Sequence, residues 1–299
     1  SVLLESCEQM LNAAYPHGQL SQWWQKQIVG VSPALWQATE VPPLTPIDEA
    51  TLRKTLQGCW FPVHAMGYNW LQSNQDSGID IAKRIDKLIE KYRGQGYQCK
   101  KVILITHSMG GLAARAVVHP QMGNLQDRVL GIVHGVMPAI GGAATYKRMR
   151  CGFEGFAGKV LGRNGPCVTA VLANSQGGLE LLPNTAYGNG WLKAHFKDTV
   201  VLELPQQGDP YSEIYKLRGR WYQLNIEQWI NPARQKTPKF TRTCKLLDGA
   251  RIFHEKLTGS YHRQSYAHYG ADAGRLAWKT VSWNIHAAQF NHVHEATIV

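Results

Sequence analysis

The sequence predicts an α/β fold with a mostly parallel sheet and helices on both of its faces. Two short apolar runs, 101–106 (KVILIT) and 128–135 (RVLGIVHG), are typical of strands buried in a parallel sheet. Helical patterns precede and follow the first run. This alternation of strand and helix is typical of a doubly wound sheet.

The length and composition are consistent with one domain over residues 1–299, since 44% of the residues are apolar and can fill a sizeable core. The formal charge of +11 favours anionic partners such as nucleic acid or acidic lipid, and solubility alone is the equally simple alternative. No nucleic-acid-binding motif is visible, so nucleic acid is not an expected partner. No apolar run approaches the roughly 18 residues of a membrane span. The chain begins at Ser1 without an initiator methionine, so we expect parts of the full protein to lie outside it.

Before the first strand, the chain mixes loop-like and regular patterns. Residues 1–58 predict irregular structure followed by a helix that starts near Pro46, with acidic residues early and basic residues late. The stretch 59–70 (CWFPVHAMGYNW) predicts a buried strand that ends at Gly67.

The next segment, 79–93 (IDIAKRIDKLIEKYR), has apolar residues at helical spacing with charges between them. Asp76 or Ser77 is expected to cap the start of this helix, and Gly94 to end it.

The pattern changes after Gly135. Residues 136–198 are rich in Gly, Pro and Asn, and we interpret them as a cap or lid insertion. A strand is then expected at 199–205 (TVVLELP) and a mainly helical insertion at 211–258. Two late strands are expected in the motifs SYAHYG and KTVSWNI, at 265–270 and 279–285.

Ser108 has the sequence context of a catalytic nucleophile. It lies in THSMGG (106–111), between an apolar strand and a helix of small residues. A nucleophile elbow needs such a sharp turn, with small residues two positions before and after the serine. Gly110 satisfies this condition, whereas Thr106 replaces the usual glycine. In this position the Met109 amide is expected to donate to an oxyanion. The alternative is a serine that only caps the helix.

The motifs THSMGG (106–111) and MGYNWLQSN (66–74) resemble those of α/β-hydrolase lipases of the lecithin:cholesterol acyltransferase and PGAP1-like kind. In that group a Tyr-(Asp/Asn)-Trp turn precedes the helix that leads to the nucleophile strand, and Tyr68, Asn69 and Trp70 match it. Two later stretches, 133–155 and 171–184, resemble bacterial phospholipase effectors of type VI secretion systems. The resemblance covers roughly residues 60–285.

This resemblance implies a serine esterase that acts on phospholipid membranes of rival cells. It also implies secretion from a bacterial cell, action in the target periplasm or membrane, and an immunity protein in the producing cell. The sequence departs from the family in two ways: it lacks an early strand with a His-Gly or Pro-Gly turn, and a Gly-Asp-Gly-Thr-Val motif after 265–270. Either the acid and base lie elsewhere in the chain, or they lie outside it.

A serine nucleophile needs a base, and the base needs an orienting acid. The expected chain order is Ser, acid, His. Asp209 follows the predicted strand 199–205 and is the first candidate acid, although an Asp-Pro turn explains it equally simply. Asp248 and Asp272 are the alternatives.

His262, in a loop before a late strand, is the first candidate base, and His286 is the alternative. His268 alternates within the predicted strand 265–270, so we interpret it as a packed residue.

No cofactor or metal site is expected. His292-x-His294-Glu295 has strand spacing for a metal, but a solvated tail is the simpler reading. The cysteines form no CxxC pair, and whether Cys151 and Cys167 form a disulfide is left open.

The predicted cap contains both basic and apolar side chains. The basic residues either meet a lipid phosphate or form a solvated face, and the apolar residues either line an acyl pocket or form the core of the cap. These residues are Lys147, Arg148, Arg150, Lys159 and Arg163, and Tyr146, Met149, Phe153, Phe156, Val160 and Leu161.

The leading hypothesis is therefore a phospholipase A-like serine esterase. The alternatives are a soluble carboxylesterase or acyltransferase, and an inactive hydrolase-fold protein that binds lipid or a protein partner.

Overall fold

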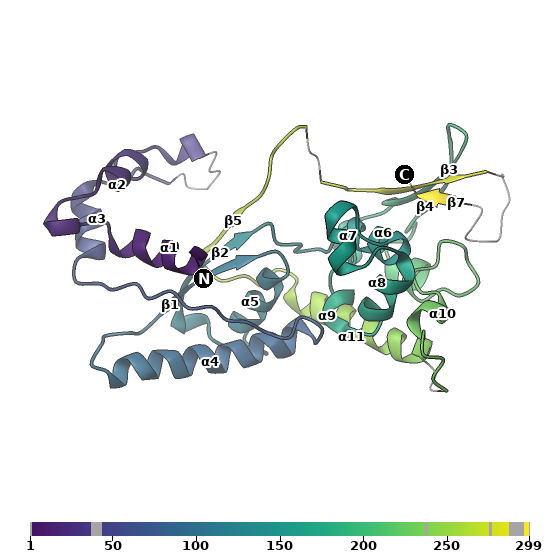
Figure 1. Ribbon diagram of the computed structural model, residues 1–299, viewed down its shortest axis with the longest axis horizontal. Coiled ribbons are helices and arrows are strands. Elements are labelled where there is room, and N and C mark those ends of the chain that lie inside the picture. The colour runs from purple at the N-terminus through teal and green to yellow at the C-terminus, as the bar shows by residue number, and fades with distance from the viewer. Residues whose placement is uncertain (1, 37–43, 237–238, 275–276, 287–295, 299) are drawn as a thin grey trace. The chain divides into compact units, whose positions relative to one another are not determined.

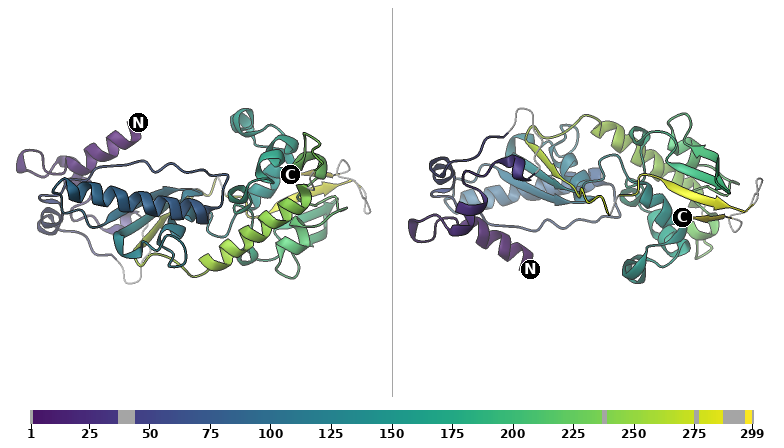
Figure 2. Two further views of the ribbon diagram at one scale, coloured as in Figure 1. Left: turned by 90° about the horizontal axis from the view of Figure 1, so that it is seen from below. Right: turned by 90° about the horizontal axis from the view of Figure 1, so that it is seen from above.

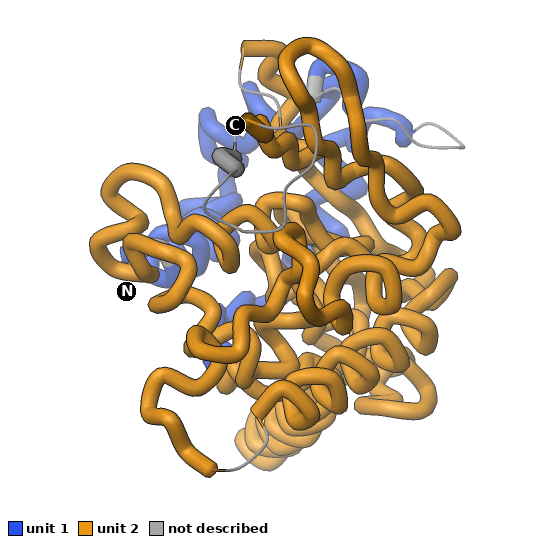
Figure 3. Tube along the Cα trace, turned by 90° about the vertical axis from the view of Figure 1, so that its right-hand side faces the viewer, with its two compact units in different colours: residues 1–67 blue, residues 68–299 orange. Residues whose placement is uncertain are grey.

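The computed structural model describes residues 2–36, 44–236, 239–274, 277–286 and 296–298. The chain divides into two compact units, Ser1–Gly67 and Tyr68–Val299 (Figure 3). Ser108 and both described sheets belong to the second unit. The single domain 1–299 stays a prediction.

The first unit is more helical than its sequence predicts. The helices are α1 (Val2–Asn12), α2 (Gln22–Gln27) and α3 (Glu49–Leu56), with short turns η1 (Pro16–Gly18) and η2 (Pro33–Trp36) between α1 and α3. The prediction of irregular structure was wrong for α1 and α2. The helix expected near Pro46 is α3, and the Asp48 carboxylate caps it by accepting from the Thr51 amide at 2.7 Å.

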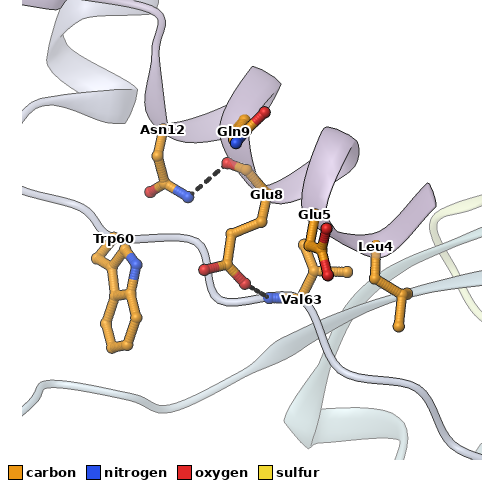
Figure 4. Close-up of a pocket in the computed structure, with 7 residues that line it drawn as sticks. All are labelled: Leu4, Glu5, Glu8, Gln9, Asn12, Trp60 and Val63. Atoms are coloured by element: carbon orange, nitrogen blue, oxygen red, sulfur yellow. Dashed lines mark hydrogen bonds between the residues drawn. The ribbon is translucent and has the colours of Figure 1, made fainter. Parts of the chain in front are cut away.

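The strand predicted at 59–70 is absent: the structure shows an extended segment without a β-ladder there. Side chains of α1 satisfy the backbone that a neighbouring strand would otherwise bind. The Asn12 amide group donates to Phe61 O and accepts from Phe61 N, both at 2.9 Å, and the Glu8 carboxylate accepts from Val63 N at 2.8 Å. Figure 4 shows the shallow pocket between α1 and this segment.

In the second unit, the first sheet has the order β1-β2-β5 and is parallel throughout (Figure 1). Its strands are β1 (Val102–His107), β2 (Val129–Gly135) and β5 (Ser265–His268), which confirms three of the expected strands. β1 lies at the edge of this sheet rather than at its centre.

Helices cover one face of the first sheet. These are α5 (Gly110–Val118), which contacts β1 and β2, and α4 (Asn74–Gly94), which packs on α5 (Figure 2). The two helices approach closely because Gly78 lies against α5: a Cβ at this glycine would come within 2.5 Å of Ala116 Cβ. α4 ends at Gly94 as expected, but its N-cap is Ser73 rather than Asp76 or Ser77.

The other face of this sheet presents exposed apolar side chains. Ile103 and Ile105 of β1, and Tyr266 of β5, point to that face because paired residues of a parallel sheet share a face. The expectation of helices on both faces is therefore met on one side of β1 only.

A second sheet follows, with the order β4-β3-β6-β7. It contains β4 (Thr199–Leu204) and β6 (Val281–Ile285), both expected, and β7 (Ala296–Ile298). It also contains β3 (Leu192–Phe196), which lies inside the stretch that we interpret as a cap. The β3–β6 pair is parallel, and the β3–β4 and β6–β7 pairs are antiparallel.

Residues 136–198 and 211–258 supply the helices around the second sheet, and the role of the first stretch as a cap or lid stays a prediction. Their side chains build a large core with β3, β4 and β6, in which Tyr146, Trp191, Tyr215 and Trp283 are buried. The elements are α6 (Ala143–Cys151), α7 (Gly155–Leu161), α8 (Gly165–Leu172), α9 (Gln176–Leu179), η4 (Thr185–Tyr187), the π-helical turn η5 (Tyr211–Tyr215), α10 (Glu227–Ile230) and α11 (Lys239–Leu257).

Among the described helices, none is long and apolar enough to cross a membrane.

Candidate active site

Ser108 occupies the turn between β1 and α5 with a backbone φ of 51°. A positive φ is uncommon outside glycine and is strained, and such strain is typical of a nucleophile elbow. The Ser108 amide donates to Gly135 O of β2 at 2.8 Å, so the turn is held to the sheet by its backbone. The residue is half-buried.

The side chains around the turn explain how Thr106 is tolerated. The Thr106 hydroxyl lies 3.1 Å from His134 Nδ1, and its Cβ would be 3.9 Å from a Cβ added at Gly110. Position 110 therefore has room for a small side chain. The crowded position is Gly111, where an added Cβ would lie 2.6 Å from the Met137 side chain.

The amide of Met109 is available to a ligand. Met109 is the N-cap residue of α5, and within the described parts of the chain its amide makes no hydrogen bond. No side chain caps this helix, so the structure gives Ser108 no capping role. An unpaired amide beside Ser108, at the positive end of the helix dipole, is what an oxyanion site requires.

A second strained residue lies near this turn. Val136, directly after β2, has a φ of 46°, which is an outlier for a β-branched residue. Its amide donates to His268 O at 2.9 Å. Two successive strands of the first sheet therefore end in strained turns, and strain of this kind clusters at functional sites.

Asp209 contacts no imidazole among the residues that the structure describes. Its carboxylate accepts from Tyr211 N at 3.0 Å and from the Ser212 hydroxyl at 2.8 Å, and it pairs with Arg251 at 3.3 Å. These contacts start the η5 turn, so the structure supports the Asp-Pro turn and gives no sign of a catalytic acid at this position.

His262 lies at the opposite end of the first sheet from Ser108. Gln264 N donates to its Nδ1 at 3.1 Å, so Nδ1 accepts, and the proton on Nε2 points to Val129 O at 3.1 Å. Val129 pairs with Val102. At about 3.3 Å per residue, Val102 lies about 20 Å along the chain from Ser108. The structure thus does not bring His262 to Ser108 and makes it a buried bridge between two strand starts.

The alternative candidates are also occupied or distant in the fold. Asp248, on α11, pairs with Lys216. Asp272 accepts from Gly274 N within a turn at 2.8 Å. His286 is exposed at the end of β6, in the second sheet.

The imidazole that sequence reasoning missed is His268. It is the last residue of β5 and pairs with Gly135, the residue whose carbonyl binds Ser108 N. Its exposed ring lies over Gly135: a Cβ added there would be 2.7 Å from His268 Nε2. The parallel register therefore places it at the same carboxyl end of the sheet as Ser108, with β2 between their strands. No signal in the sequence indicates this position, because the predicted strand runs to residue 270, whereas β5 ends at His268.

His134, also near the elbow, is a poor base. Burial, and to a lesser degree the positive charge of Arg115, lower the pKa of His134 to about 4. A neutral imidazole that remains unprotonated near neutral pH accepts a proton weakly.

Among the residues that the structure describes, no group of His, Cys, Asp or Glu could hold a metal ion. Cys151 and Cys167 are both exposed free thiols, so the pairing left open above is not formed. His292, His294 and Glu295 lie outside the described residues.

Comparisons with known proteins found similarity to solved structures. No protein-family model matches the chain, and no curated protein does. The chain is similar to a chain in the crystal structure of the Tle4–Tli4 complex, with 37% sequence identity and a TM-score of 0.84. The match covers 95% of this chain and 58% of the matched chain, so this chain spans little more than half the length of the chain that it matches.

Proposed function

We propose that this chain carries the nucleophile of a serine hydrolase that cleaves acyl ester bonds of lipids. The observation that supports this most strongly is the strained Ser108 between β1 and α5, next to the unpaired Met109 amide. Few other functions benefit from holding a non-glycine residue in this conformation at the end of a parallel strand.

In this mechanism the Ser108 hydroxyl attacks the ester carbonyl, and a base takes its proton. The Met109 amide donates to the oxyanion that forms. The alcohol leaves with that proton, and water then hydrolyses the acyl-enzyme and frees the fatty acid. His268 is our candidate base because it lies at the same carboxyl end of the first sheet as Ser108. The orienting acid stays open, either in this chain or outside it.

The biological role that we propose is that of an antibacterial effector of a type VI secretion system. The similarity to the Tle4–Tli4 structure supports the resemblance to such lipase effectors. On this proposal the substrates are phospholipids of a target cell, reached in its periplasm or membrane. The complex in that structure makes an immunity protein a reasonable partner for this chain as well.

The test uses two readouts on the full protein. A fluorophosphonate probe should label Ser108, and Ser108→Ala should lose labelling and lower ester hydrolysis by about 10³-fold or more. Ser77→Ala, at a buried serine of α4, is a matched control and should retain both. Hydrolysis that persists in the Ser108 variant would exclude this mechanism. Comparing phospholipid vesicles with short-chain esters separates a phospholipase from a soluble carboxylesterase or acyltransferase.

One observation favours a second candidate, an inactive hydrolase fold that binds lipid or protein. Within the described ranges, no carboxylate–imidazole pair contacts Ser108. Absence of both labelling and hydrolysis in the wild-type protein would favour this candidate.

A further inference from the structure

The short helix α7 belongs to the second unit and lies in a loop whose two ends meet. Phe153 N donates to Gly162 O at 2.9 Å and closes its base. Gly152, with a φ of 91°, approaches the returning chain so closely that a Cβ there would lie 2.4 Å from Asn164 N. The backbone therefore presents residues 154–161 as a closed projection.

The projection carries large apolar side chains on its outside. Phe156 is 77% exposed, Val160 is 72% exposed and Leu161 is 56% exposed. By contrast, Tyr146 and Met149 of the preceding helix α6 are fully buried. The apolar residues predicted for the cap thus divide into two groups: those of α6 belong to the core, with Phe153 packed against it, and those of α7 are exposed.

The projection carries one cation, Lys159, and a second cation, Arg163, follows directly at its base. Lys159 and Arg163 are exposed, and neither makes an ion pair among the described residues. The sequence has no acidic residue from position 155 to position 179. The nearest carboxylate, Glu154, already pairs with Lys147 at 3.2 Å and Arg148 at 3.5 Å.

We propose that α7 is the element by which this chain docks on an anionic lipid surface. Phe156, Val160 and Leu161 enter the interface between headgroups and acyl chains, while Lys159 and Arg163 contact lipid phosphates. Apolar residues flanked by unpaired cations are typical of interfacial helices, because long basic side chains keep their charge in the headgroup layer. A protein interface fits Lys159 less well, because lysine is depleted in such interfaces, and the projection has no Tyr or Trp, whereas Phe156 and Arg163 suit either surface.

This inference deepens the proposed function by naming the surface that meets the membrane, and it rests on that function only for its biological setting. The docking experiment therefore uses Ser108→Ala protein, which binds lipid without hydrolysing it. Co-sedimentation is measured with vesicles of phosphatidylcholine alone and with vesicles that contain phosphatidylglycerol.

The expected result is preferential binding to the anionic vesicles. Phe156→Ser/Leu161→Ser should reduce the partition coefficient by about tenfold or more, and Lys159→Glu/Arg163→Glu should reduce it several-fold and weaken its salt dependence. The controls are Leu35→Ser, at another exposed apolar residue, and Lys83→Glu/Lys87→Glu on α4, which changes the net charge equally.

Controls that reduce binding as much as the α7 variants would overturn the proposal, as would equal binding of all proteins. Self-association that the Phe156→Ser/Leu161→Ser variant abolishes, without any effect on vesicle binding, would instead assign α7 to a protein contact. Hydrolysis of a soluble short-chain ester by protein with an intact Ser108 tests the proposed function separately. If an α7 variant loses vesicle binding but still hydrolyses the soluble ester, the catalytic proposal stands and only the docking step is affected.

Discussion

The two sheets of the second unit differ in how much core they possess. The first sheet is parallel, its β1 strand leaves Ile103 and Ile105 exposed, and it ends in the strained turns at Ser108 and Val136. The second sheet is mixed and packs against helices through a large aromatic core. The proposed chemistry thus lies at the carboxyl end of the first sheet, on which the described helices cover one face only. The residues expected to form a cap contribute to the larger core around the second sheet. Substitutions in the core of the second sheet should therefore mainly change stability, and substitutions at the Ser108 turn should mainly change the proposed activity.

The largest effect is expected in the aromatic core of the second sheet. Trp191 is buried and packs edge-on against Tyr146 with ring centres 5.6 Å apart. Trp191→Ala should lower the free energy of unfolding by about 3–5 kcal/mol, since it leaves a large cavity. Urea unfolding measures this change.

The control in this case is Trp191→Phe. The indole Nε1 of Trp191 makes no hydrogen bond within the described part of the chain, so a phenyl ring loses no such bond. Trp191→Phe should therefore cost less than Trp191→Ala. If both variants lower the free energy of unfolding equally, the loss does not scale with the volume removed, which contradicts the cavity explanation.

A buried carboxylate connects the two regions and should make stability depend on pH. Glu180 follows α9 and accepts from Asn74 N at 2.9 Å, Asn74 Nδ2 at 2.7 Å and Ser73 Oγ at 3.1 Å, at the start of α4. Burial raises the pKa of Glu180 from 4.5 to about 7, although the hydrogen bonds from Asn74, Gln176 and Ser73 act in the opposite direction.

The direction in which the free energy of unfolding changes with pH follows from how many protons the folded and unfolded states bind. Between pH 4.5 and 7 the folded protein retains this proton and the unfolded chain releases it, so the free energy of unfolding falls as the pH rises. Relative to Glu180→Gln, the wild-type protein should lose about 2–3 kcal/mol between pH 4.5 and pH 8. Unfolding curves at several pH values test this, with Glu203→Gln at an exposed ion pair as the control. Parallel pH profiles of wild type and Glu180→Gln would contradict it.

His262 tests the distinction between the two ends of the first sheet. Because its ring bridges backbone groups at the starts of β2 and β5, His262→Ala should cost about 2–3 kcal/mol of stability. The rate at which a fluorophosphonate labels Ser108 in the folded fraction should stay unchanged. His286→Ala, at an exposed histidine, should affect neither quantity. Lost labelling with normal stability would instead make His262 the base.

The smallest effects are expected at the two glycines after Ser108. Gly111→Ala pushes a methyl group into Met137 and should cost about 1–2 kcal/mol. Gly110→Ala meets no atom closer than 3.9 Å and should leave the melting temperature nearly unchanged. Thermal melts of both variants measure the difference. The reverse order would mean that the crowded residue of the turn is Gly110, as the elbow pattern alone suggests.

The sequence predicted the parts of the fold that depend on local patterns. The strands β1, β2, β4, β5 and β6 and the helix α4 follow from apolar runs and helical spacing. The strand β3 was missed because its short sequence LKAHF lies among Gly, Asn and Pro residues, which indicate loops. The strand predicted at 59–70 failed because Asn12 and Glu8, distant in sequence, bind its backbone.

The sequence alone determined the candidate nucleophile, because the conformation of Ser108 depends on a strand, a turn and a helix that are contiguous in the chain. It could not determine the partners of that serine. Asp209 and His262 satisfy the expected chain order, yet local turns and strand starts use both side chains. His268 comes to the same carboxyl end of the sheet as Ser108, two strands away, only through the parallel register of β5 with β2. That register depends on contacts between residues more than a hundred positions apart, and no local pattern encodes it.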